Sequence, residues 1–294
     1  MQRIDVRKTY KLYLGGAFPR SESGRTYAVQ DVGGAVLAQA ALASRKDARD
    51  AVVAARSAVA GWSSATAYNR GQVLYRVAEM LEGRTAQLAE LVAQAEGLGE
   101  AEARAQVAAA VDRWVWYAGW TDKITQVAGA ANPVAGPYFN LSVPEPTGVV
   151  AVLAPQQSSL LGLTSVVAPV IATGNTCVVV TSFARPLPAV ALGEVLATSD
   201  VPGGVVNLLT GSAAELGPWL ASHRDVDAID LTGAAALTGP TWGELEAAAA
   251  DTLTRIRRPE DLPDGGEPDW TLVPDPKRML GFMETKTVWH PKGR

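Results

Sequence analysis

The sequence predicts an α/β protein built on a Rossmann-like parallel sheet with flanking helices. Two patterns predict this fold. From Gly148 the chain repeats a unit of apolar strand, turn and helix, with the strands GVVAVLA, NTCVVVT, GVVNLLT and DAIDLTG. Continuous apolar strands that alternate with helices specify a parallel sheet covered on both faces. Ahead of this region, residues 45–123 follow the 3.6-residue period of amphipathic helices.

The N-terminal third predicts short strands followed by helices. KLYLGGAF and RTYAVQD read as strand hairpins broken by glycine. Ser44 is the expected N-cap of a first helix, and a second helix runs through NRGQVLYRVAEMLEGRTAQLAELVAQAEG to a stop at Gly97 and Gly99. A third helix, EAEARAQVAAAVDRWVWYAGWTDKI, carries aromatic side chains on more than one face, which indicates core packing or a subunit contact.

The C-terminal half predicts a hairpin, the repeated βα units, a linker and a last strand. YFNLSVPEP alternates weakly, as one arm of a β-hairpin does, and a last helix is expected at residues 241–257. PEDLPDGGEPDWTLVPDP is rich in proline and is expected to be a linker ordered only by its contacts. METKTVWHPKGR predicts a short strand that Pro291 stops. The expected divisions are residues 1–131, 132–146, 147–257, 258–278 and 279–294.

Composition narrows the function classes. Hydrophobic residues make up 48% and charged residues 19% of the 294 residues, the balance of a soluble globular protein. The net charge of −4 comes without a long basic run, which argues against nucleic acid as a partner. No apolar stretch reaches the roughly 18 residues that span a bilayer, and no apolar leader follows the charged N-terminus, so no membrane association and a cytoplasmic location are expected.

The chain contains few cysteine and histidine residues that could act as a nucleophile, a base or a metal ligand. A single cysteine, Cys177, excludes an internal disulfide, and two histidines, His223 and His290, are too few for a histidine-rich metal site. The turn in EPTGVVAVLAPQQSSLLGL precedes a helix that Ser158 or Ser159 is expected to cap, and reactive side chains are usually found at such a turn. It presents two glutamines instead, and neither can act as a nucleophile or a base.

Taken in order, several segments resemble the aldehyde dehydrogenase superfamily over most of the chain. YLGGAF, SGRTYAV and LAQAALASRKDARDAVVAARSAVAGW are similar to that family's N-terminal hairpins and first helix. EPTGVVAVLAP, APVIATGNTCVVV, VPGGVVNLLTG and HRDVDAIDLTG are similar to its cofactor-domain landmarks, and KTVWHPKG to its C-terminal strand. The ordered set is specific, whereas any one string is weak. The resemblance makes residues 1–131 and 147–257 a cofactor-type domain.

Several positions depart from the pattern that this resemblance implies. The family follows the first strand with Pro-Trp-Asn, whose asparagine donates to an oxyanion, but this chain has Gln156 and Gln157. Thr181 and Ala184 stand where the family has a Lys and a Glu that grip the adenosine ribose. Ala234 replaces the serine before the phosphate-binding helix. The resemblance therefore implies a weakened cofactor site.

No catalytic residue is expected. Nothing in residues 240–294 resembles the family's glutamate segment or its cysteine nucleophile, and Cys177 lies inside a predicted strand, where cysteine is a small buried hydrophobe. We expect a member that lacks the catalytic domain and binds no cofactor, or NAD(P) only weakly. The vestigial cofactor positions are Gln156, Gln157, Thr181, Ser182, Gly211, Thr232 and Gly233.

The resemblance implies that the hairpin and the C-terminal strand form an oligomerisation surface. Alternation in TKTVWHP places Thr285, Thr287 and Trp289 on one face and Lys286, Val288 and His290 on the other. The hairpin around residues 138–143 is the expected neighbour of this strand. The expected interface residues are Tyr138, Asn140, Ser142, Thr285, Thr287, Val288 and Trp289.

The function that follows is a non-catalytic subunit that pairs, through β-strands, with a catalytic aldehyde dehydrogenase or with itself. The chain is similar to the second, non-catalytic module of the family 16 aldehyde dehydrogenases and is expected to be inactive alone. Two alternatives stay open. One is an NAD(P)-dependent aldehyde oxidoreductase with a non-standard site, and the other is a nucleotide-sensing regulator.

Overall fold

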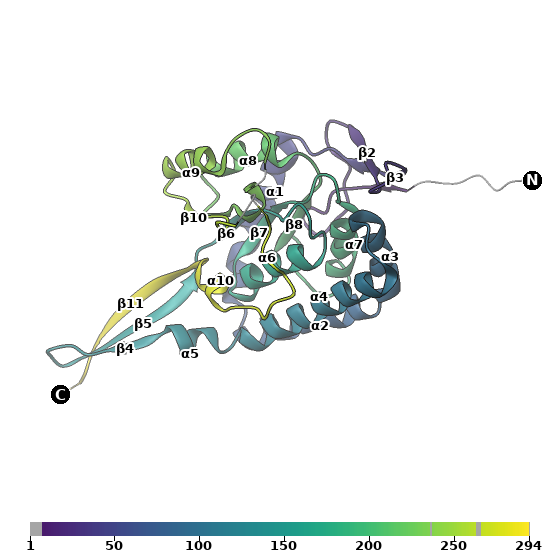
Figure 1. Cartoon of the computed structure of the whole chain (residues 1–294). Coiled ribbons are helices and arrows are strands. Elements are labelled where there is room, and N and C mark those ends of the chain that lie inside the picture. Colours follow the sequence, from purple (N-terminus) through teal and green to yellow (C-terminus); the bar gives the residue numbers. More distant parts are fainter. Residues whose placement is uncertain (1–7, 236, 263–265, 294) are drawn as a thin grey trace, which may run out of the picture.

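The computed structural model describes residues 8–235, 237–262 and 266–293, and a five-stranded parallel sheet forms the centre of the described chain. The strand order is β10-β9-β6-β7-β8, which confirms the predicted α/β fold with a parallel sheet (Figure 1). Its strands are β6 (Val149–Leu153), β7 (Thr176–Val180), β8 (Val206–Leu209), β9 (Ala228–Asp230) and β10 (Arg255–Arg257).

Strand β10 was not expected, because the sequence predicts a helix to residue 257. The helix α9 ends at Ala250, and Leu253 takes a left-handed backbone with φ 56°. The hydroxyl of Thr254 then donates to the carbonyl of Val226 at 3.0 Å, so the chain turns back beside β9. The alanine-rich stretch has helical propensity, but this tertiary pairing along β9 decides the conformation of residues 255–257.

Helices cover both faces of the sheet, as the repeated βα units predict. One face carries α6, α7, α2, α3, α4 and α10, and the other carries α1, α8 and α9 (Figure 1). The helices are α1 (Arg45–Ser64), α2 (Ala67–Glu82), α3 (Thr85–Glu96), α4 (Glu100–Trp120), α5 (Ile124–Ala128), α6 (Leu161–Ala172), α7 (Leu187–Leu196), α8 (Ala213–Ala221), α9 (Trp242–Ala250) and α10 (Lys277–Leu280). None of the described helices is long and apolar enough to cross a membrane.

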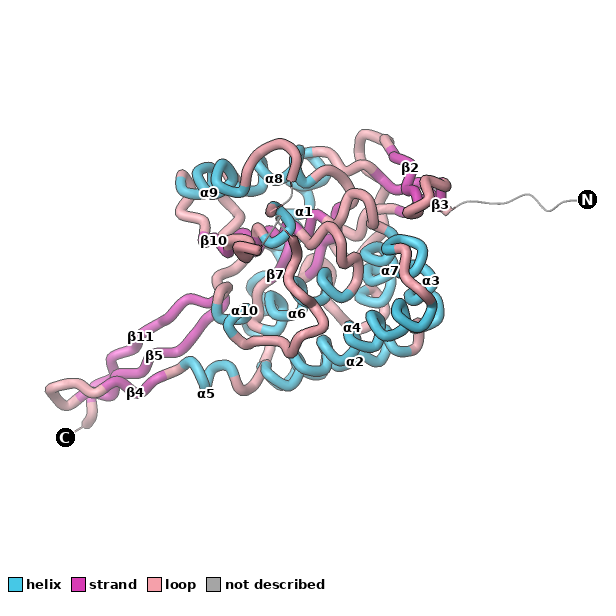
Figure 2. The backbone as a smooth tube through the Cα atoms, viewed as in Figure 1, coloured by secondary structure: helices cyan, strands magenta, loops and turns pink. Residues whose placement is uncertain are grey.

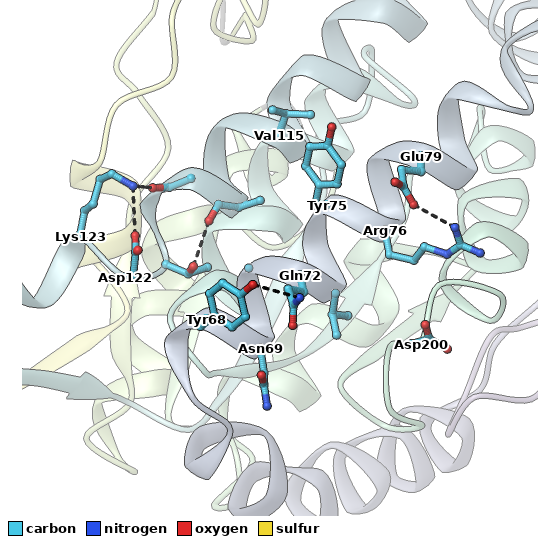
Figure 3. A pocket seen from close by; sticks show the side chains of 15 residues that line it. Tyr68, Asn69, Gln72, Tyr75, Arg76, Glu79, Val115, Asp122, Lys123 and Asp200 are labelled. Atoms are coloured by element: carbon cyan, nitrogen blue, oxygen red, sulfur yellow. Dashed lines mark hydrogen bonds and ion pairs between the residues drawn. The ribbon is translucent and has the colours of Figure 1, made fainter.

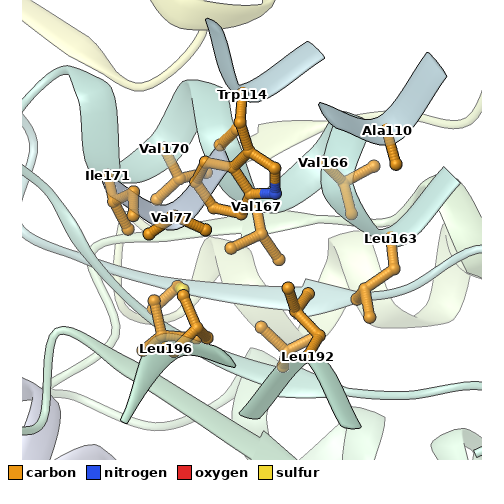
Figure 4. Packing of buried hydrophobic residues seen from close by; sticks show 14 of the residues in the cluster. Val77, Ala110, Trp114, Leu163, Val166, Val167, Val170, Ile171, Leu192 and Leu196 are labelled. Atoms are coloured by element: carbon orange, nitrogen blue, oxygen red, sulfur yellow. The ribbon is translucent and has the colours of Figure 1, made fainter. Parts of the chain in front are cut away.

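Strand alternation divides the core into two clusters, one on each face. In β6, Val150 and Val152 face the cluster of α6 and α4, whereas Val149 and Leu153 face the cluster of α1 and α8. Trp114 lies at the centre of the first cluster among valines of α6 (Figure 4). All five residues of β6 are buried, as a strand covered on both faces requires.

Helix boundaries partly follow the sequence signals. Ser44 forms a capping box with Asp47, as predicted for the start of α1, and Gly97 ends α3 in the left-handed conformation at φ 72°. The single helix expected before Gly97 is two helices, because the chain turns between Glu82 and Thr85. Of the aromatic residues of α4, Trp114 and Tyr117 are buried, as core packing predicts.

The N-terminal strands form a small sheet, β1-β3-β2, at the edge of the molecule. Its strands are β1 (Thr9–Tyr10), β2 (Thr26–Gln30) and β3 (Val36–Ala41). The hairpin expected in KLYLGGAF is reduced to single bridges. Tyr13 instead exchanges backbone hydrogen bonds of 3.0 and 2.7 Å with Leu208 of β8, so this segment protects the edge of the central sheet.

A three-stranded arm, formed by β11, β5 and β4, projects from the body (Figures 1 and 2). We call this sheet the arm; it contains β4 (Ala130–Asn132), β5 (Tyr138–Pro146) and β11 (Met283–Pro291). The C-terminal strand pairs antiparallel with β5 from Met283 opposite Pro146 to Pro291 opposite Tyr138. The C-terminal strand therefore lies beside the hairpin, as predicted from the sequence.

Candidate functional site

The carboxyl edge of the central sheet holds the crevice where ligands bind in open α/β folds. Here the turn from β6 into α6 presents the backbone N–H groups of residues 156–159. One carboxylate oxygen of Glu267 accepts from the N–H groups of Gln156 and Gln157, the latter at 2.7 Å, and the other accepts from Ser158 at 3.1 Å. Such a turn binds anions, and a side chain of this chain occupies it.

A second carboxylate completes the turn. Glu96, the last residue of α3, accepts from the N–H of Ser159 at 2.6 Å and from its hydroxyl at 2.5 Å. The predicted N-cap is wrong, because α6 begins after Leu160 and neither Ser158 nor Ser159 is the N-cap residue. The hydroxyl of Ser158 still accepts from the N–H of Gly162, in the first turn of the helix, at 2.9 Å. The N–H groups of all four residues 156–159, in the turn before α6, are thus held by carboxylates of the chain.

The two glutamines differ in their use. Gln156 folds back: its amide donates to the carbonyl of Ala154 at 2.7 Å and accepts from the N–H of Phe183 at 3.2 Å. Gln157 lines a hollow of about 410 Å³, and its carbonyl accepts from Arg185. The hollow lies beside Glu267, and the described residues that line it include neither cysteine nor histidine.

The hydroxyls of Thr181 and Ser182, two of the expected cofactor positions, donate inside the fold. Thr181 donates to the carbonyl of Leu209 at 3.3 Å, and Ser182 donates to the carbonyl of Gln156 at 2.8 Å. Gly211, at φ 151°, is close-packed, because a Cβ there would lie 3.3 Å from the backbone nitrogen of Ala43. These positions stabilise contacts between strands and offer no free group toward the crevice.

Thr232 and Gly233 lie in a buried turn after β9. Thr232 donates its N–H to a carboxylate oxygen of Asp230 at 2.9 Å, and the other oxygen pairs with Arg278 at 2.7 Å. A Cβ at Gly233 would lie 1.9 Å from the carbonyl oxygen of Ala154, so only glycine fits there. The glycine is explained by packing between the ends of β9 and β6.

As the crevice residues are arranged in the structure, they do not fit a bound dinucleotide. A bound pyrophosphate needs open N–H groups, and a ribose needs free side-chain partners. The N–H groups of the turn before α6 are taken by Glu267 and Glu96. The hydroxyls of Thr181 and Ser182 donate to carbonyl groups of the chain.

Cys177 and the histidines are not among the residues that line the crevice. Cys177 is fully buried in β7, and burial raises the pKa of its thiol. His223 accepts from the N–H of Asp225 at 3.1 Å, and partial burial lowers its imidazole pKa. Among the described residues, no group of three or more His, Cys, Asp or Glu side chains could hold a metal ion.

A larger hollow than the one beside Glu267 lies on the outer surface between α2 and α4 (Figure 3). It is a shallow groove of about 980 Å³ with Tyr68 and Tyr75 along one side. Four of the charged side chains that line it form ion pairs, Arg76 with Glu79 at 2.9 Å and Lys123 with Asp122 at 3.0 Å. The crevice is therefore the better candidate, because it lies where the sheet directs backbone donors.

The arm collects the expected interface residues on two faces. Thr287 faces Ser142 with their hydroxyl oxygens 2.8 Å apart, and the rings of Tyr138 and Trp289 lie 5.9 Å apart on the same face. Asn140 is buried there and accepts from Asn132 at 2.6 Å. Thr285 shares this face, because it lies two residues before Thr287. Ser142 and Thr287 thus bind each other across the strands, and Asn140 binds Asn132 of β4.

On the opposite face of the arm, Val288 was predicted as an interface residue, but Phe139 and Leu141 were missed. Val288 lies opposite Leu141, and Phe139 is the next residue on that face, with 44%, 46% and 55% of each side chain exposed. The alternation in YFNLSVPEP contains the signal, since apolar residues take every second position. The exposed apolar side of the arm is therefore centred on Leu141.

The fold defines the chain as an α/β protein with a Rossmann-like parallel sheet. A model of the family described as "Aldehyde dehydrogenase family" matches residues 18–255, and the chain belongs to that family. The predicted resemblance is therefore confirmed.

Individual relatives agree with this assignment. Cytosolic 10-formyltetrahydrofolate dehydrogenase of Mus musculus is 33% identical over 79% of this chain and 26% of its own length. The putative aldehyde dehydrogenase DhaS of Bacillus subtilis is 31% identical over 92% of this chain and 53% of its own. The chain thus spans from about a quarter to about half of these curated relatives.

Solved structures show the same relation. The NAD+ complex of an aldehyde dehydrogenase from Bacillus cereus is 28% identical, with a TM-score of 0.79, over 85% of this chain and 50% of its own. HpcC from Thermus thermophilus is 31% identical, also with a TM-score of 0.79, over 85% and 47%.

Proposed function

We propose that this chain is a non-catalytic aldehyde dehydrogenase family subunit that pairs, through the strands of its arm, with a catalytic aldehyde dehydrogenase. The observation that carries the proposal is strand β11. Eight of its nine residues are exposed, and its outer edge has no strand beside it among the described residues. A long exposed strand edge presents unpaired N–H and carbonyl groups, which favour pairing with another chain.

The sides of the arm support the same proposal. Phe139, Leu141 and Val288 form an exposed apolar side, and Trp289 is 59% exposed on the other. Apolar groups held out on a projecting sheet are typical of a surface that a partner covers. A second copy of this chain is the other candidate partner, and the experiment separates the two.

The crevice supports the non-catalytic part. Its turn carries amides and internally bound hydroxyls, and the only cysteine of the chain is buried in β7. A thiol with a raised pKa inside a sheet cannot reach a substrate as a thiolate. We therefore expect no aldehyde oxidation by the purified chain, and weak or no NAD(P) binding.

A nucleotide-binding role is the second candidate. It is favoured by one observation, the similarity to a dehydrogenase solved as an NAD+ complex. Calorimetry with NAD+ tests it: an affinity near micromolar would favour a nucleotide sensor, whereas our proposal expects about millimolar or weaker binding. A cytoplasmic location stays a prediction.

Light scattering tests the pairing directly. The full chain and a chain ending at Met283 are measured alone and mixed with a full-length aldehyde dehydrogenase of the same organism. We expect a complex only with the full chain, because the truncated one lacks the exposed residues 284–291 of β11. A complex of the full chain with itself would assign the arm to self-association.

Point variants sharpen this test. Leu141→Lys places a charge on the apolar side of the arm and should weaken the complex at least about tenfold, as buried interface anchors do. Val53→Lys is the matched control, since Val53 is 55% exposed on α1. Equal masses for all chains, mixed or alone, would show that the arm is not a docking surface.

A further inference from the structure

We propose that residues 266–280 form an intramolecular latch that occupies the crevice at the start of α6 and keeps a dinucleotide out. We call this segment the latch. The role of the latch is separate from the proposed pairing function, because the latch lies in the crevice and the pairing surface is the arm. A nucleotide is then excluded by a segment that can move away, and not only by the absence of the family's cofactor-binding side chains.

The first anchor of the latch is Glu267. Its carboxylate accepts three successive backbone N–H groups, from Gln156, Gln157 and Ser158, and the indole N–H of Trp270 at 3.3 Å. Hydrogen bonds to an ionised acceptor are among the strong ones, and the helix N-terminus adds to them. Glu267 therefore stands where a bound anion would stand.

The second anchor fixes the backbone of the latch. Arg113 projects from α4, is buried, and donates to the carbonyls of Trp270 and Leu272, the latter at 3.0 Å. The Trp270 ring lies against the first turn of α6, since a Cβ on Gly162 would lie 3.0 Å from its indole nitrogen. An arginine buried for two backbone carbonyls specifies the path of an otherwise irregular segment.

The third anchor lies at the other side of the crevice. Arg278 pairs with Asp230 at 2.7 Å, with 9% and 0% of their side chains exposed, and its guanidinium lies 5.5 Å from the Trp270 ring centroid. Asp230 ends β9, and Glu267 binds beside β6. The latch thus spans neighbouring strand ends of the central sheet.

The latch excludes a dinucleotide by occupancy and by charge. A pyrophosphate at this turn would need the N–H groups that Glu267 holds. It would also meet the carboxylate of Glu96, which binds Ser159 at the same turn. Two like charges at contact distance repel, and partial burial reduces the screening by water. Binding therefore requires that Glu267 leave first.

The test uses Glu267→Gln, which keeps the size of the side chain and removes its charge. Hydrogen exchange should accelerate at least about tenfold at the amides of residues 156–158, since a charged hydrogen-bond acceptor is lost. Inorganic pyrophosphate and NAD+, titrated by calorimetry, should each bind at least about tenfold more tightly than to the unchanged chain.

Asp269→Asn is the matched control in the same segment, because its carboxylate accepts only from Thr271 among the described residues. It should leave exchange and binding unchanged. If Glu267→Gln does not fold, Glu267→Asp, which keeps the charge on a shorter stem, is measured and should shift both readouts in the same direction.

Two outcomes would overturn the proposal. Faster exchange without tighter pyrophosphate or NAD+ binding would mean that the latch stabilises the turn but excludes nothing. NAD+ binding to the unchanged chain at micromolar concentration, with the exchange of residues 156–158 still slow, would mean that the ligand and Glu267 do not compete.

Discussion

At the scale of single residues, burial decides what the polar groups of this chain can do. Cys177 is 0% exposed in β7, and burial raises the pKa of its thiol. Tyr117 is buried in α4, and burial raises the pKa of its phenol to about 12. Neither group can ionise near neutral pH, so each acts as a packing residue.

Iodoacetamide labelling checks the prediction for Cys177. The native thiol should react at least about a hundredfold more slowly than the unfolded chain at pH 7 and at pH 9, because the reactive thiolate does not form inside the sheet. Cys177→Ala should lower the free energy of unfolding by about 1 kcal/mol through lost packing. Rapid native labelling would contradict the buried placement.

At the scale of elements, one buried ion pair joins the central sheet to the C-terminal segment. Arg278 of α10 pairs with Asp230 at the end of β9. Asp230 also accepts from Thr232, so the carboxylate holds the turn that follows β9. Breaking such a pair leaves an uncompensated buried charge, which is costly.

A double-mutant cycle measures this pair. Arg278→Met should lower the free energy of unfolding by about 3–5 kcal/mol, and Asp230→Asn together with it should cost clearly less than the two single changes summed. Arg258→Met, which breaks a pair with Glu246 whose arginine is 64% exposed, should cost under about 1 kcal/mol. Equal losses in urea denaturation for Arg278→Met and Arg258→Met would contradict this account.

At the scale of the whole molecule, the C-terminal chain belongs partly to the body and partly to the arm. Met279 and Phe282 are 0% exposed and pack in the cluster around α6. Phe282 also accepts at its carbonyl from the buried Asn175 at 2.8 Å. The expected division at residue 279 therefore cuts through core residues, and the exposed part of β11 begins after Met283.

Two truncations separate these roles. A chain ending at Met283 should keep its melting temperature within a few degrees, because mainly exposed residues are lost. A chain ending at Pro276 loses Met279 and Phe282 from the core, at about 2–5 kcal/mol each, and should unfold or melt far lower. Thermal circular dichroism checks both, and equal melting temperatures would show that the tail does not stabilise the body.

The sequence by itself determined strands β6 to β9, most of the helices and the family. The apolar runs of β6 and β7 carry their own period, and Ser44 and Gly97 mark helix ends through local hydrogen bonds. Only the tertiary structure decided what occupies the turn at the start of α6. Glu267 lies 110 residues after Gln157, in a proline-rich segment without periodicity. The path of such a segment is set by remote partners such as Arg113, and local sequence does not encode it.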